Sequence, residues 1–205
     1  DLPTLWGAFL ILFDKKGDFH YDIVSAFIKS IRGSDPNAAV YWLARMIEAG
    51  EDIAFIARRM LILAAEDVGI ANPTALVIAN NTFQAIKTVG NPEGRILLSE
   101  CAIYLASSPK SNKAYRAIDL AIEKVKKTGN LQVPIHLRNA STKLMKDLGY
   151  GKGYEYAHDF KNEFTFQEFL PEEISGTKFY EPGENPKENS IRDFLKNRWK
   201  SKYDY

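Results

Sequence analysis

The sequence predicts an all-α fold, a bundle of several helices, and three observations favour it. Asx-Pro pairs stand before three helix-like runs, at Asp35-Pro36, Asn72-Pro73 and Asn91-Pro92. An Asx side chain accepts hydrogen bonds from the free N–H groups of a first helical turn, and a proline there loses only an N–H without a partner. Apolar residues then recur with a period of about 3.6 residues. No alternation typical of strands occurs before residue 150.

Helices follow one another closely along the first 150 residues. The predicted segments are 4–13, 21–32, 36–49, 52–68, 73–89, 92–107, 113–128 and 139–148. Glycine follows four of them, at Gly50, Gly69, Gly90 and Gly129. Glycine readily takes the left-handed conformation that closes a helix. The joints between segments are short, as expected for antiparallel neighbours in a helical bundle.

The sequence changes character after Gly149, where glycine, proline and aromatic residues become frequent. The stretch to about residue 189 contains Phe160, Phe164, Phe166, Phe169, Phe179, Tyr180, Pro171, Pro182 and Pro186. We therefore predict an irregular arm over residues 151–205 whose rings dock on the bundle or on a neighbouring subunit. Each buried ring removes roughly 150–250 Å² from water. A last helix is expected at 191–202, capped by Asn189 or Ser190.

Composition and absent motifs exclude several classes of protein. With 45% apolar residues and a net charge of +1, the 205-residue chain is neither disordered nor uniformly basic. No GxxxxGK[ST], GxGxxG or HExxH motif is present, so no catalytic residue, cofactor site or metal site is predicted. The single cysteine, Cys101, lies among apolar residues and is expected to be a buried structural thiol. No segment has the length of a transmembrane helix or the basic start of a signal peptide.

Residues 108–152 carry a local excess of positive charge, with ten Lys and Arg against three Asp and Glu. Such asymmetry is found on phosphate-binding surfaces, and equally on solvated helix faces. The candidate nucleic-acid contacts are Lys110, Lys113, Arg116, Lys124, Lys126, Lys127, Arg138 and Lys143. No base-reading motif accompanies them, so any binding should be independent of base sequence and sensitive to salt.

The stretch from Ala71 to Pro109 is poor in charge, since only four of its residues are charged. Two consecutive helices of this kind either form the centre of the bundle or have one face covered by another subunit, because interface cores are depleted of charge. The two explanations are compatible. The candidate core or interface residues are Leu76, Phe83, Ile86, Leu97, Tyr104 and Leu105.

A long series of matches gives the chain a family resemblance over about residues 14–205. The matching segments are Asp18–Asp22, Ser25–Pro36, Tyr41–Met46, Gly50–Asp52, Phe55–Arg59, Ala106–Asn112, Val133–Ala140, Gly149–Tyr154 and Tyr156–Pro171. Together they resemble the C-terminal region of the replication-associated recombination protein family. These are the bacterial RarA/MgsA AAA+ ATPases, related to the eukaryotic Werner helicase-interacting protein.

The resemblance implies that the chain is part of a longer protein with several domains. Residues 1–19 would end the AAA+ lid, residues 20–150 would form a helical oligomerisation domain similar to a clamp-loader collar, and 151–205 would be the arm. The ATPase core, with its Walker motifs, ATP and magnesium, would precede residue 1. This chain is therefore expected not to hydrolyse ATP.

The resemblance also implies partners and a location. The family protein is a DNA-dependent ATPase of replication forks that assembles as a tetramer, contacts single-stranded or forked DNA and associates with single-stranded DNA-binding protein. It is cytoplasmic and nucleoid-associated, with no membrane partner. Two functions stay open for this chain: a tetramerisation module, favoured by the charge-poor helices and the aromatic arm, and a DNA-binding module that uses the basic segment 108–152.

Overall fold

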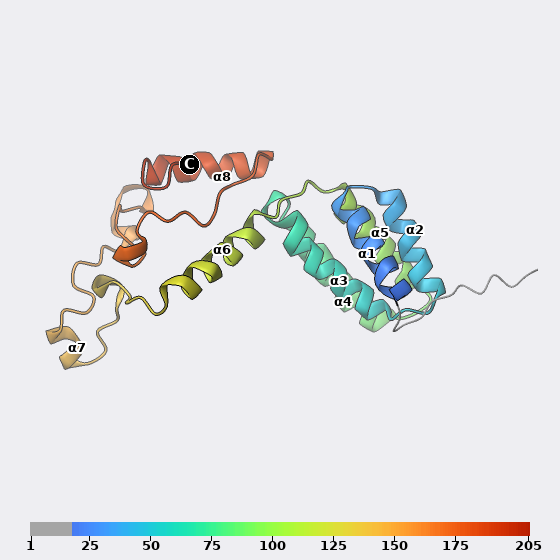
Figure 1. Cartoon of the computed structure of the whole chain (residues 1–205), viewed down its shortest axis with the longest axis horizontal. Helices are drawn as coiled ribbons and strands as arrows, with labels where there is room; N and C mark the ends of the chain where they lie inside the picture. The colour runs from blue at the N-terminus through green and yellow to red at the C-terminus, as the bar shows by residue number, and fades with distance from the viewer. Residues whose placement is uncertain (1–17) are drawn as a thin grey trace, which may run out of the picture. The chain divides into compact units, whose positions relative to one another are not determined.

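The computed structural model describes residues 18–205, and their regular structure is helical throughout (Figure 1). The helices are α1 Asp18–Arg32, α2 Pro36–Glu48, α3 Ile53–Leu63, α4 Thr74–Val89, α5 Gly94–Ser107, α6 Lys113–Thr128, α7 Lys143–Asp147 and α8 Pro186–Trp199. A π-helical turn, Ala64–Val68, extends α3, and short 3-10 turns occur mainly in the arm. Residues 18–205 contain no strand, so the all-α prediction is confirmed. The helix expected at 4–13 lies outside the described residues.

The chain divides into two compact units, one through Asn112 and the other Lys113–Tyr205. The first unit holds α1 to α5, and the second holds α6 to α8 with the irregular arm. From the sequence, a boundary was predicted after residue 150, where glycine, proline and aromatic residues become frequent. The structure divides the chain ahead of α6, a helix that has no buried residue.

The core of the first unit is built from the apolar faces of all five of its helices. Phe27 of α1, Leu43 of α2, Met60 of α3 and Leu98 of α5 are each no more than 2% exposed. Burying a side chain of this size stabilises the fold by roughly 1.5–3 kcal/mol. The small residues Ala75 and Ala79 of α4 are also buried, and their size lets neighbouring helices approach closely.

Helix starts follow the predicted capping at α2 and depart from it at α4 and α5. Asp35 accepts a hydrogen bond from the N–H of Ala38 at 2.9 Å, as predicted. Asn72 does not cap α4 with its side chain, whose NH2 group donates to the hydroxyl groups of Tyr104 and Ser108. Helix α5 begins at Gly94 with no side-chain cap, so the cap predicted at Asn91 is wrong as well.

The last helix begins five residues earlier than predicted. Asn185 caps α8 by accepting from the N–H of Glu188 at 3.0 Å, so the caps predicted at Asn189 and Ser190 are wrong. Proline at position 186 fits the first helical turn. The carboxylate of Glu188 is fully buried and accepts from the Tyr180 hydroxyl at 3.1 Å, which holds the arm against this helix.

The segment 139–148 is helical only over Lys143–Asp147, with Thr142 as its cap. Rings of the arm gather around Trp199 of α8: its ring centroid lies 5.3 Å from that of Phe164 and 6.2 Å from that of Phe169. Phe164, Phe166 and Phe169 of the arm thus pack on Trp199 of α8, within the second unit. No helix in the described part of the chain is long and apolar enough to cross a membrane.

Candidate assembly surface

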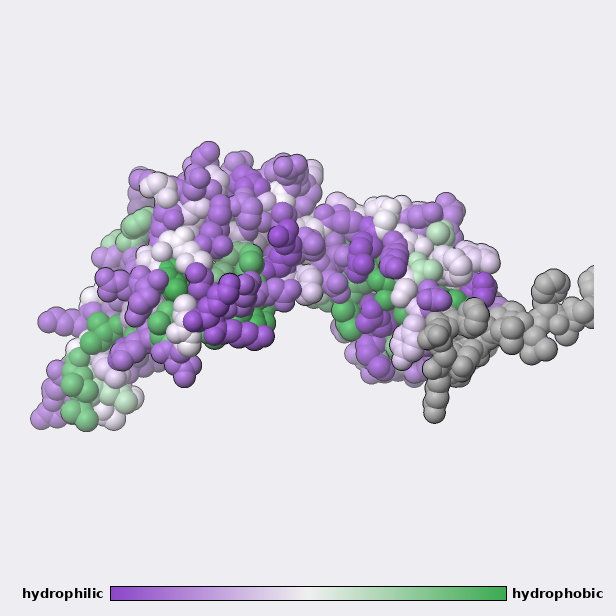
Figure 2. All heavy atoms as spheres, viewed as in Figure 1, coloured by the Kyte–Doolittle hydropathy of each residue, from purple (hydrophilic) through white to green (hydrophobic). Residues whose placement is uncertain are grey.

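Helix α6 is amphipathic, yet it buries none of its residues. The apolar side chains of one face, which we call the α6 stripe, are Ala114, Tyr115, Ile118, Ala121, Ile122 and Val125. At about 3.6 residues per turn they occupy roughly a third of the helix circumference. Tyr115, Ile118, Ile122 and Val125 are 46%, 55%, 45% and 61% exposed. Hydrophobic residues reach the surface in the part of the molecule that holds α6 and α7 (Figure 2).

The spacing of the four large stripe residues alternates between three and four. This spacing is that of the a and d positions of a coiled coil, which normally pack against another helix. The opposite side of α6 is engaged within the second unit. There Leu120, Lys124 and Lys127 line a cavity of about 160 Å³ together with residues 177–179. Residues 177–179 therefore lie across this cavity from one side of α6, and the stripe is on the other side of the helix.

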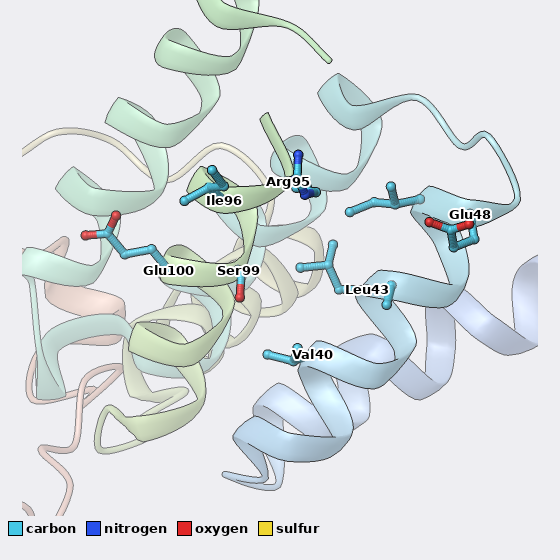
Figure 3. Close-up of a pocket in the computed structure, with 9 residues that line it drawn as sticks. Val40, Leu43, Glu48, Arg95, Ile96, Ser99 and Glu100 are labelled. Carbon is cyan, nitrogen blue, oxygen red and sulfur yellow. The ribbon is translucent and has the colours of Figure 1, made fainter. Parts of the chain in front are cut away.

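A second apolar surface lies in the first unit, between α2 and α5 (Figure 3). We call it the α2–α5 groove. Its volume is about 530 Å³, and its lining is mainly apolar. Helix α2 supplies Val40, Leu43, Ala44, Ile47 and Glu48, and α5 supplies Arg95, Ile96, Ser99 and Glu100. Ile96 is 58% exposed, so this surface is open to a partner.

Lys110, one of the predicted nucleic-acid residues, belongs to the first unit. Its ammonium donates to the Ser34 hydroxyl at 3.0 Å and to the carbonyl of Ser108 at 2.6 Å. Burial lowers the pKa of Lys110. This lysine therefore holds the turn after α5 in place.

The other predicted basic residues lie in the second unit, where Arg138 and Lys127 are both engaged. Arg138 donates to the carbonyl of Val133 at 2.7 Å and lies over the ring of Tyr150 at 5.1 Å. Lys127 pairs with Glu123 at 2.5 Å. Arg116, Lys126 and Lys143 are exposed, whereas Lys113 and Lys124 are half-buried.

The predicted core or interface residues fall into three groups. Ile86 and Leu105 are buried in the core, and Phe83, Leu97 and Tyr104 pack against it. Leu76 is 45% exposed on α4, so it is not a core residue, and the interface explanation remains a prediction for it. The α6 stripe was not among the predicted surfaces. Its a and d spacing was present in the sequence, but this segment was interpreted only through its lysines.

The described residues offer no clear catalytic or metal site. Cys101 is fully buried, as predicted, and burial raises the pKa of its thiol to about 11. Across residues 18–205, no three His, Cys, Asp or Glu side chains are grouped so as to hold a metal ion. His158 lies 3.7 Å from Glu163, and both side chains are well exposed. The uncovered apolar surfaces thus remain the most distinctive features of the chain.

Comparison with known proteins shows the family of the chain. The model of the "MgsA AAA+ ATPase C terminal" family matches residues 33–199, which is most of the chain. The chain belongs to this family. Its relatives include Replication-associated recombination protein A of Escherichia coli, 45% identical over 89% of this chain and 41% of that protein. The protein of the same name from Coxiella burnetii is 44% identical over 89% of this chain and 42% of its own length.

The family extends to eukaryotes. A protein of Dictyostelium discoideum named ATPase WRNIP1 is 45% identical over 83% of this chain, which corresponds to 20% of that larger protein. The MgsA-type chain described here spans about two fifths of the length of the bacterial relatives. It corresponds to a C-terminal part of an AAA+ ATPase, and the predicted family resemblance is confirmed.

Proposed function

We propose that this chain is the assembly module of an AAA+ ATPase that acts in replication-associated recombination, and that it holds the subunits together as a tetramer. The observation that carries this proposal is the α6 stripe, in which four large apolar side chains are about half exposed along one helix. Leaving such a surface in water is unfavourable by roughly 25 cal/mol per Å² of apolar area. A second copy that covers the stripe would recover this free energy.

A module that joins ATPase subunits would strengthen the binding of the whole protein to DNA. The relatives' names describe ATPases and a protein of replication-associated recombination. Nucleotide and magnesium would then be bound by a part of the protein outside this chain. Joining several ATPase subunits raises the local concentration of their DNA-binding surfaces, so that weak individual contacts combine into tight binding.

Light scattering coupled to gel filtration tests the proposal with the chain at tens of micromolar. We expect the mass of a tetramer for the natural sequence and a monomer for Ile118→Glu/Ile122→Glu, because two buried charges would prevent helix packing. Leu144→Glu on α7, where the leucine is 68% exposed and outside the stripe, is the matched control and should still assemble. A monomeric parent chain, or a double variant that still assembles, would contradict the proposal.

DNA binding is a second candidate, favoured by the charge of residues 113–152, which carry nine Lys and Arg against three Asp and Glu. Phosphate contacts of exposed residues such as Lys126 and Lys143 would be sensitive to salt. Fluorescence anisotropy with labelled single-stranded and forked DNA at low salt tests this function. Binding that is weakened by Lys126→Glu/Lys143→Glu would support it, and an absence of binding by the parent chain would exclude it.

A further inference from the structure

We infer that the α2–α5 groove of one copy receives the α6 stripe of a second copy. This inference rests on the proposed assembly function and names the two surfaces that would meet. The first unit offers an open apolar groove, and the second unit offers a helix face on which Ile118, Ile122 and Val125 are 55%, 45% and 61% exposed. Both surfaces are mainly apolar, so each could bury the other.

The groove has the form of a helix-binding site. Val40, Ala44 and Ile47 line it from α2, and Ile96 and Ser99 line it from α5. Ala44 and Ser99 are small, so a docked helix could approach closely at these positions. From Val40 to Glu48 the lining spans about 12 Å along α2, at about 1.5 Å per residue.

The α6 stripe has the spacing that such grooves recognise. Helices that dock in apolar grooves use anchors at i, i+3, i+4 and i+7. Ile118, Ile122 and Val125 follow this spacing, and Tyr115 extends it by one further turn. The stripe from Tyr115 to Val125 spans about 15 Å, which is close to the length of the groove.

The charges around the two surfaces are complementary. Glu48 on α2 and Glu100 on α5 border the groove, and Arg95 lies between them. On α6, Lys126 follows the stripe residues closely around the helix on one flank, beside Asp119, and Lys124 lies beyond the other flank. In the described part of the chain, neither Glu48 nor Glu100 takes part in an ion pair, and the same is true of Lys124, Lys126 and Asp119. Glutamates would thus meet lysines, and Arg95 would meet Asp119.

This pairing determines the kind of assembly that forms. The groove and the stripe are different surfaces. Each copy would therefore dock its stripe in the groove of one neighbour and bind the stripe of another neighbour in its own groove. Head-to-tail contacts of this kind generate rings when the rotation between copies closes. Pairing of one stripe with another stripe would instead produce a two-fold dimer.

Disulfide trapping between two singly substituted chains tests the contact directly. Ile96→Cys is placed on an affinity-tagged copy and Ile122→Cys on an untagged copy, and the mixture is oxidised mildly. We expect a tagged–untagged heterodisulfide as the main product. Cys101 is fully buried and should not react, and the natural chain is the control for this. Replacing the second variant with Leu148→Cys, at a leucine that is 56% exposed directly after α7, should abolish the product.

Charge reversal tests the same contact independently, through the strength of association between copies. Glu100→Lys and Lys126→Glu should each weaken association roughly tenfold, because like charges would then face each other, and the double variant should restore it. If the parent chain is monomeric, the proposed function itself is wrong. If the parent chain assembles while trapping gives mainly Ile122→Cys homodimers and both single reversals leave association unchanged, only the groove–stripe contact is wrong.

Discussion

Arg32 and Asp67 form an ion pair that joins α1 to the π-helical turn after α3, with Nε of Arg32 donating to Oδ1 of Asp67 at 2.8 Å. The carboxylate is 10% exposed, whereas the guanidinium side chain is 46% exposed. The backbone carbonyl of Asp67 also accepts from the N–H of Ser111 at 2.7 Å. One residue therefore connects α1, the end of α3 and the segment after α5.

Removal of the guanidinium should destabilise the first unit. Arg32→Ala leaves the buried Asp67 carboxylate without its charged donor, so we expect a loss of about 1–3 kcal/mol in the free energy of unfolding. Urea denaturation followed by circular dichroism measures this loss. Arg58→Ala, at an exposed arginine of α3, is the matched control and should change stability by less than about 0.5 kcal/mol. Equal effects of the two variants would show that the ion pair contributes nothing.

Gly69 makes the same region intolerant of a side chain. Its φ is +52°, and a Cβ there would lie 2.6 Å from the carbonyl oxygen of Ser111. Gly50 also has a positive φ, +74°, but a Cβ would meet nothing within 4 Å. Gly50→Ala should therefore cost only the conformational penalty of about 1–2 kcal/mol.

Gly69→Ala should cost more than Gly50→Ala, because the backbone must also move away from Ser111. The difference between the two midpoints of thermal unfolding measures the extra cost at Gly69, which combines the contact with Ser111 and a backbone at φ 52° and ψ −135°. A Gly69→Ala variant no less stable than Gly50→Ala would mean that the turn adapts without strain.

The helical body could be predicted because local signals and tertiary packing agree there. Asp35 caps α2, and Gly50 and Gly90 close helices with positive φ values, as the sequence indicated. The signals failed where a tertiary partner competed with the local one. Asparagine is a residue type that often caps helices, but the side-chain NH2 group of Asn72 donates to the hydroxyl groups of Tyr104 and Ser108 instead.

The candidate site was harder to predict, because exposure is a property of the packed fold. The sequence shows that Ile118 and Ile122 share a helix face, and such a face is usually buried. Only the structure shows that it is not. In the same way, Lys110 has the charge of a phosphate contact, but its hydrogen bonds to Ser34 and Ser108 give it a structural role.

The thiol of Cys101 should be unreactive in the native protein. Burial raises the pKa of its thiol to about 11, so the reactive thiolate is scarce at neutral pH. A thiol-specific chromogenic reagent at pH 8 should therefore react slowly with the folded chain and stoichiometrically in denaturant. Rapid labelling of the folded chain would show that α5 opens readily, and it would remove the basis for using the natural chain as a trapping control.

Glu168 is the carboxylate that organises the end of the arm. Its side chain accepts hydrogen bonds from the Ser175 hydroxyl, from the N–H of Leu170 at 2.8 Å and from the Lys202 ammonium at 2.9 Å. Its backbone carbonyl lies 2.7 Å from Nε2 of His136. Burial by itself would raise the pKa of Glu168, but these donors outweigh burial and lower it to about 2.

A pKa below that of the unfolded chain, about 4.3, means that the Glu168 interactions stabilise the fold above that pH and are lost as the pH falls through about 2. Glu168→Gln should therefore lower the free energy of unfolding at pH 7, and its deficit should shrink between about pH 5 and pH 2. Urea titrations across this range measure the deficit. Glu172→Gln, at a neighbouring exposed glutamate, is the control. A deficit for Glu168→Gln that stays constant down to pH 2 would assign the loss to packing instead of to the charged carboxylate.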